Sequence, residues 1–245
     1  MKNIDHQFRN ASFLPKQPRE PLLNVPFTIV VLIALCFCIY FVHQYFFSDQ
    51  LYIKSLEFFS FTPVLFKAEP LTFFHTMVSY SFMHGSVKHV TLNMAWLLIF
   101  GTPLVRQFGG GRFLIFWALT AMIAALTYFV FHQESVISLV GASGAVSGMM
   151  GAIVRYGFPL GYWGKNTDNE RLLSSLLSLK QALSSKGVLV YVSIWLGIDF
   201  IIGISSFLLE GDAVSIAWEA HIGGFFAGFL LIGFFDIPQK QLQYK

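Results

Sequence analysis

The chain has 245 residues, of which 55% are hydrophobic, only 12% are charged and 28 are Phe. Soluble domains carry about 25% charged residues, so this composition excludes an ordinary soluble domain and indicates a surface that faces the lipid bilayer. The formal net charge of +3 is small, and we expect no nucleic-acid partner.

Six apolar segments along the chain have the composition of membrane helices. A helix that crosses a bilayer needs about 20 apolar residues, and these segments meet or approach that length. In chain order they are residues 25–47, 89–105, 112–131, 139–156, 188–209 and 215–235. The sequence therefore predicts an all-α membrane protein with a six-helix membrane domain at 25–236, a cytoplasmic N-terminal tail at 1–24 and a cytoplasmic C-terminal tail at 237–245.

The first segment contains both cysteines of the chain, Cys36 and Cys38. Residues two apart on a helix point to different faces, so these two cannot form a disulfide with each other. The segment has no small-residue cleavage site and continues into aromatic sequence, so we expect a retained span and not a cleaved signal peptide.

Residues 48–84 form a long connection between the first two predicted spans. Their aromatic content, which includes Phe58, Phe59, Phe73 and Phe74, favours a segment that lies in the membrane interface, part helix and part turn. A small external cap is the alternative. The glycines at 109–111 predict a tight turn between the second and third spans. Residues 158–186 are expected to form a basic cytoplasmic loop.

The distribution of Lys and Arg gives the predicted orientation. With residues 1–24 in the cytoplasm, only Lys54, Lys67 and Lys88 of the 16 cations fall outside. Cytoplasmic loops of membrane proteins are rich in Lys and Arg, so both termini are expected in the cytoplasm. We expect a multi-pass protein of the cell membrane (the inner membrane).

Polar residues occur in the first two turns of the second, fourth and sixth predicted helices, which all run from outside to inside. These residues are His89, Asn93, Ser143 and His221. Polar groups within a bilayer are costly and face the interior of a helix bundle or a water-filled cavity. Their similar depth predicts one site below the outer surface.

Glycines are placed to bring the fourth and sixth helices together. Gly224 and Gly228 share one helix face with His221, and Gly144 and Gly148 recur at four-residue spacing after Ser143. Small residues let two membrane helices approach closely. Contact between these faces would bring the imidazole of His221 to the hydroxyl of Ser143. A serine that is hydrogen-bonded to a base is the minimum unit of nucleophilic catalysis.

The start of the fourth helix can also stabilise negative charge. Gly141-Ala142-Ser143-Gly144 opens this helix, and the N–H groups of a first helical turn have no partner within the helix. His89 and Asn93 lie four residues apart on one face of the second helix. Together these groups form a candidate oxyanion hole.

Other interpretations of these residues remain. Ser143 alone is typical of a packing contact between small residues. A lone His in a membrane helix is typical of a structural hydrogen bond or a proton relay. His84 and His89 lack the His-Glu-x-x-His pattern of a zinc site, so we expect no metal. We expect Asp199, in the fifth span, to bond a neighbouring helix and not to be needed by a Ser–His pair.

Three blocks of sequence resemble the motifs of rhomboid proteases. Residues 82–93 resemble the family's second-helix signature, Gly141-Ala142-Ser143-Gly144 resembles its Gly-x-Ser-Gly nucleophile motif, and residues 220–228 resemble its sixth-helix base motif. The similarity runs from about residue 71 to residue 236, and the three motifs occur in the same order as in the family. The chain is thus identified as similar to the bacterial six-helix type of this family.

The resemblance implies an intramembrane serine endopeptidase that cuts transmembrane segments of other single-pass or multi-pass proteins. Ser143 would be the nucleophile and His221 the general base of a dyad without an acid. His89, Asn93 and the Ser143 N–H would form the oxyanion hole, and no cofactor would be needed. The alternatives are a catalytically silent rhomboid-like protein that binds membrane clients, and a small transporter or channel.

The chain departs from the family pattern at three places. His75-Thr76 stands where many rhomboids have Trp-Arg, Ser147 where an aromatic residue stacks on the base, and Val105 where a glutamate is frequent. The nucleophile and the base are both retained.

Overall fold

The computed structural model describes residues 25–157, 176–208 and 217–236. Within these ranges the chain is helical, and the one β-bridge pairs Phe61 with Leu139. The predicted tails at 1–24 and 237–245 lie outside the described residues, as does most of the predicted loop at 158–186.

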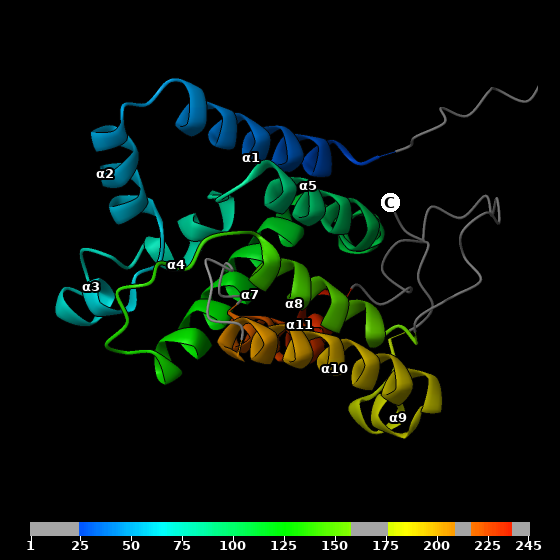
Figure 1. The fold of residues 1–245 in the computed structure, drawn as a ribbon. Coiled ribbons are helices and arrows are strands. Elements are labelled where there is room, and N and C mark those ends of the chain that lie inside the picture. Colours follow the sequence, from blue (N-terminus) through cyan, green and yellow to red (C-terminus); the bar gives the residue numbers. More distant parts are fainter. Residues whose placement is uncertain (1–24, 158–175, 209–216, 237–245) are drawn as a thin grey trace, which may run out of the picture.

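Each of the six predicted segments contains a helix (Figure 1). Three helices in the described ranges are long and apolar enough on their own to cross a membrane: α1 (Phe27–Tyr45), α7 (Gly110–Phe131) and α11 (Trp218–Phe235). The other segments contain the continuous run α5 (Val87–Trp96), η2 (Leu97–Gly101) and α6 (Thr102–Phe108), then α8 (Ser143–Val154) and α10 (Lys186–Leu208). The all-helical fold is confirmed, and the count of six spans stays a prediction.

The run from α5 to α6 changes its winding in the middle, because η2 is a π-helix. A Cβ atom at Gly101 would lie 2.8 Å from Ile29 Cδ1 and 3.1 Å from the ring of Phe113, so α1 and α7 pack closely against this segment. Gly109 ends α6 with a φ of 86°, which glycine adopts without steric cost. Because α7 begins at Gly110, the predicted turn is confined to Gly109.

The connection between the first two predicted spans contains short helices, and its position in the membrane interface stays a prediction. They are α2 (Asp49–Phe59), α3 (Pro63–Ala68), α4 (Thr76–Ser79) and the 3₁₀ helix η1 (Tyr80–Phe82). Figure 1 shows them gathered at the end of the bundle where α5 and α8 begin. A further short helix, α9 (Leu179–Ser184), precedes α10 and starts with a capping box between Ser178 and Gln181.

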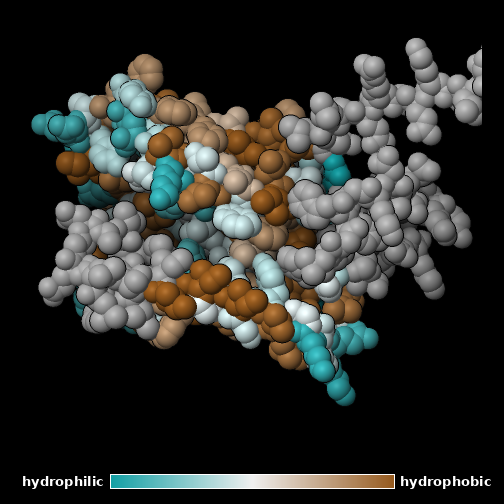
Figure 2. All heavy atoms as spheres, turned by 45° about the vertical axis from the view of Figure 1, so that its right-hand side comes forward, coloured by the Kyte–Doolittle hydropathy of each residue, from teal (hydrophilic) through white to brown (hydrophobic). Residues whose placement is uncertain are grey.

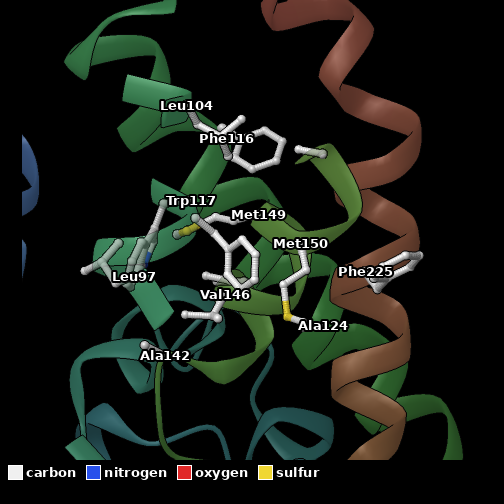
Figure 3. Packing of buried hydrophobic residues seen from close by; sticks show 14 of the residues in the cluster. Leu97, Leu104, Phe116, Trp117, Ala124, Ala142, Val146, Met149, Met150 and Phe225 are labelled. Atoms are coloured by element: carbon white, nitrogen blue, oxygen red, sulfur yellow. The ribbon is translucent and has the colours of Figure 1, made fainter. Parts of the chain in front are cut away.

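The core surrounds α8, in which every residue from Gly144 to Val154 is buried. Figure 3 shows Leu97 of η2, Trp117 of α7 and Met149 of α8 among the side chains of one buried hydrophobic cluster. A single short helix enclosed in this way presents its first residue, Ser143, from inside the bundle. This is where the fold positions the candidate site.

The outer helices present apolar side chains to their surroundings. Exposed residues include Val30 and Leu35 of α1, Ile115 and Val130 of α7, Ile194 and Ile201 of α10, and Leu230 and Phe234 of α11. Figure 2 shows such apolar side chains reaching the surface. A large exposed apolar surface marks a membrane or protein contact, and its spread over several helices fits lipid. On α1, Cys36 is buried and Cys38 is exposed, on different faces as predicted.

Candidate active site

The turn before α8 is shaped by Gly141. This residue has a φ of 110°, and its N–H donates to the carbonyl of Tyr80 at 3.0 Å. A Cβ atom at position 141 would lie 2.6 Å from the ring of His89. Both the backbone conformation and the close approach of the imidazole therefore require glycine here. The turn places Ser143 at the first position of α8, where the N–H groups have no helical partner.

The glycine faces of α8 and α11 are in contact, as the sequence predicts. A Cβ atom at Gly224 would lie 2.1 Å from the carbonyl oxygen of Gly144, and one at Gly228 would lie 1.8 Å from that of Gly148. Only residues without a side chain allow two helix backbones to come so close. This contact fixes the position of His221, one turn before Gly224 on the same face.

The close packing brings His221 to Ser143. The imidazole Nε2 of His221 lies 2.9 Å from the hydroxyl Oγ of Ser143, within hydrogen-bond distance. Both residues are only partly buried, which suits a group that must meet a substrate. The predicted pair therefore has the geometry of an activated serine nucleophile.

Asp199 of α10 contacts the other side of the imidazole. Its Oδ1 lies 2.6 Å from Nδ1 of His221. The expectation that this carboxyl bonds a neighbouring helix is confirmed, although we expected no role for Asp199 beside the Ser–His pair. The signal in the sequence was the position of an acidic residue in the middle of an apolar span, which by default marks a functional site.

The predicted oxyanion residues lie beside the Gly141 turn. Asn93 is buried, and its Nδ2 donates to the carbonyl of His89 at 3.2 Å and lies 3.5 Å from a Cβ atom built on Gly141. A side-chain amide has two N–H groups, so one donor of Asn93 is left beyond this bond. His89 covers the turn with its ring, as described above.

His84 also belongs to this cluster, although the sequence analysis assigned it no role beyond a rejected metal site. Its ring meets that of His89 edge to face, with 5.2 Å between centroids. Its Nε2 lies 3.5 Å from the backbone N of Ala142, the residue before the candidate nucleophile. His84 thus supports both the position of His89 and the turn into α8.

Two contacts hold the outer ends of the helices around the site. His132, at the end of α7, bonds Glu219 in the first turn of α11 at 2.9 Å, two residues before His221. The bridge between Phe61 and Leu139 joins the connection at residues 48–84 to the segment that leads into Gly141.

The structure shows the surroundings of three residues that depart from the family pattern, His75, Ser147 and Val105. His75 bonds the carbonyl of Phe58 at 2.7 Å and that of Thr72 at 3.1 Å, so it fastens the end of α2 to the turn before α4. Ser147 is buried one turn after Ser143, and Val105 is buried in α6.

Comparison with known proteins shows which family the chain is related to. The family model of the Rhomboid domain matches residues 72–237, which include α5, α8 and α11. The chain belongs to the rhomboid family. It is 28% identical over 158 residues to Rhomboid protease GluP of Bacillus subtilis (strain 168), an alignment that covers 64% of this chain and 25% of GluP.

Two further relatives show the same level of similarity. Rhomboid protease GlpG of Serratia proteamaculans (strain 568) is 27% identical over 163 residues, 66% of this chain and 48% of GlpG. RHOMBOID-like protein 4 of Arabidopsis thaliana is 26% identical over 155 residues, 63% of this chain and 32% of the relative. The aligned part of the chain thus spans less than half the length of these three relatives. Membership of this family, together with the apolar helices, makes the chain an integral membrane protein.

Proposed function

We propose that this chain is an intramembrane serine endopeptidase that cleaves transmembrane segments of other membrane proteins. The observation that supports this most directly is the 2.9 Å contact between His221 Nε2 and Ser143 Oγ at the start of a buried helix. The protease names of GluP and GlpG, to which the chain is similar, point to the same activity.

The chemistry follows the course of other serine hydrolases. Ser143 Oγ attacks the carbonyl carbon of the scissile peptide bond, and the hydroxyl proton passes to His221 Nε2. The imidazolium then gives this proton to the leaving amine nitrogen as the C–N bond breaks, which leaves an acyl ester on Ser143. A water molecule then gives a proton to Nε2 and attacks the ester carbonyl carbon. The bond from this carbon to Oγ breaks, Oγ takes the proton from Nε2, and the new carboxyl end of the substrate is released.

Negative charge develops on the former carbonyl oxygen during both attacks. The N–H of Ser143, the free amide N–H of Asn93 and the ring of His89 surround the turn at Gly141 and are the proposed donors to this oxygen. Donors that are already in place stabilise the transition state without reorganisation, and removing one typically lowers the rate by about 10²–10³.

Six membrane spans with cytoplasmic termini are part of the proposal. Arg106 lies at the end of α6 and Arg155 at the end of α8, whereas Ser143 lies at the opposite end of α8. The excess of cations on the Arg side supports a cytoplasmic location for that side and an external approach of water to Ser143. In a Cys36→Ser, Cys38→Ser background, Ser143→Cys should react with a membrane-impermeant thiol reagent added outside, and reaction only from the cytoplasmic side would contradict this orientation.

The activity itself is tested by cleavage of a model transmembrane substrate in liposomes. Ser143→Ala and His221→Ala should each abolish cleavage with normal membrane insertion, and the double variant should be no worse than either single variant, because the two residues act as one unit. Cleavage that survives Ser143→Ala would overturn the serine mechanism. A wild-type protein that binds such substrates without cleaving them would instead be a client-binding member of the family.

A further inference from the structure

Asp199 is an acidic residue within the apolar helix α10, and its carboxyl group contacts the imidazole of the proposed base. The carboxylate Oδ1 lies 2.6 Å from Nδ1 of His221. Only 10% of the Asp199 side chain and 17% of the His221 side chain are exposed. Taking a carboxylate out of water within a bilayer is energetically costly unless partners compensate it. This position therefore calls for a specific partner.

The partners of Asp199 within the described part of the chain are few. Its Oδ2 is buried and has no hydrogen-bond partner there, so the contact through Oδ1 with His221 is the compensation that the structure shows. A carboxyl placed only to join two helices would be satisfied by any donor on α11. Here the donor is the imidazole whose other nitrogen contacts Ser143 Oγ.

The contact determines how the imidazole is protonated. When Asp199 is an ionised carboxylate it only accepts hydrogen bonds, and Nδ1 of His221 then carries the proton that joins it to Asp199. In a neutral imidazole the other nitrogen, Nε2, is then an acceptor, and it faces the Ser143 hydroxyl. This is the tautomer that can remove the serine proton, and a nearby carboxylate also stabilises the imidazolium that results.

We infer that Asp199 is a positioning residue for His221, so that Ser143, His221 and Asp199 act as one unit from three helices, α8, α11 and α10. The inference rests on the proposed protease function. It replaces the expectation of a dyad without an acid with a Ser-His-Asp arrangement in which the acid comes from the fifth predicted span.

The test compares kcat and KM of the wild-type protein and of Asp199→Asn in liposomes. An amide has nearly the same shape, but it can donate to Nδ1 and so leave the proton on Nε2, and it has no charge to stabilise an imidazolium. We expect kcat to fall at least about tenfold, with KM and the melting temperature little changed; the same exchange in the chymotrypsin triad costs about 10⁴ in kcat. Asp199→Glu keeps the carboxylate and should recover part of the lost rate.

The matched control is Glu219→Gln, which removes the charge from the pair between the Glu219 carboxylate of α11 and the His132 imidazole at the end of α7. Glu219 bonds His132, whereas the contacts of His221 in the described part of the chain are with Asp199 and Ser143, so this variant should lower thermal stability and leave kcat near the wild-type value. A merely structural Asp199 would behave like Glu219.

The outcomes separate this inference from the proposed function. If the wild-type protein neither cleaves substrate nor reacts with a serine-directed probe, the protease function fails. If the wild-type protein is active and Asp199→Asn keeps kcat within about twofold, or if Asp199→Glu and Asp199→Asn are folded and equally inactive, Asp199 does not act as a carboxylate on His221 and the inference is wrong.

Discussion

Gly224 of α11 faces the carbonyl oxygen of Gly144 so closely that a Cβ atom at position 224 would lie 2.1 Å from it. Gly144 directly follows Ser143, and Gly224 lies three residues after His221. The contact that joins the two helices is therefore also the contact that sets the distance between the nucleophile and the base. A backbone oxygen cannot rotate away as a side chain does, so any side chain at 224 must push the helices apart.

We predict that Gly224→Ala lowers both stability and cleavage. Overpacking of this kind typically costs about 1–3 kcal/mol, and a separation of about 1 Å between reacting groups can lower a rate about 10²-fold. Thermal unfolding and substrate cleavage in the same detergent measure the two effects. Gly233→Ala is the control on the same helix, since its Cβ would meet only Leu176 at 3.9 Å, an ordinary contact. A Gly224→Ala protein as active as Gly233→Ala would contradict this account of the packing.

Asn93→Ala should lower kcat without abolishing cleavage. Loss of one donor to a developing oxyanion typically costs about 10²–10³ in rate, whereas loss of the nucleophile removes the covalent route altogether. Single-turnover kinetics would compare this variant with Ser143→Ala and with Thr91→Ala, which alters an exposed position of the same helix. Complete inactivity of a folded Asn93→Ala protein would give Asn93 a different role.

Phe200→Ala should increase cleavage and decrease thermal stability. The ring of Phe200 meets that of Trp218 edge to face at 5.9 Å, next to Asp199 and near the start of α11. Such pairs contribute about 0.5–1.5 kcal/mol, so loss of this pair would loosen the contact between α10 and α11. We expect a substrate helix to enter the site from the bilayer at this contact. Phe234→Ala, at a position that is 86% exposed, should change neither quantity. Reduced cleavage by Phe200→Ala would argue against entry at this contact.

Much of the fold and part of the site could be predicted from the sequence because they depend on periodicity. Apolar segments give the helices, and the spacing of His221, Gly224 and Gly228 gives the face that meets α8. The π-helix at Leu97–Gly101 could not be predicted in this way, since α1 and α7 pack against it from distant parts of the chain.

The role of Asp199 was missed for a related reason. Its place within the fifth span was evident, but its partner depends on how α10 is rotated about its own axis, and that rotation is set by packing. The stacked rings of Trp195 and Phe225, with 4.8 Å between centroids, are one such contact. The sequence therefore showed an acidic residue in the membrane but not that it meets His221.

The most direct test of the account is the reaction of Ser143 with a fluorophosphonate probe in native membranes, with the labelled residue located by mass spectrometry. The wild-type protein should be labelled at Ser143, and His221→Ala should lose this labelling because the hydroxyl no longer has a base at 2.9 Å. Ser147→Ala, which alters the buried serine one turn later, should be labelled like the wild-type protein. Labelling of a different serine, or equally fast labelling of His221→Ala, would contradict the claim that His221 activates Ser143.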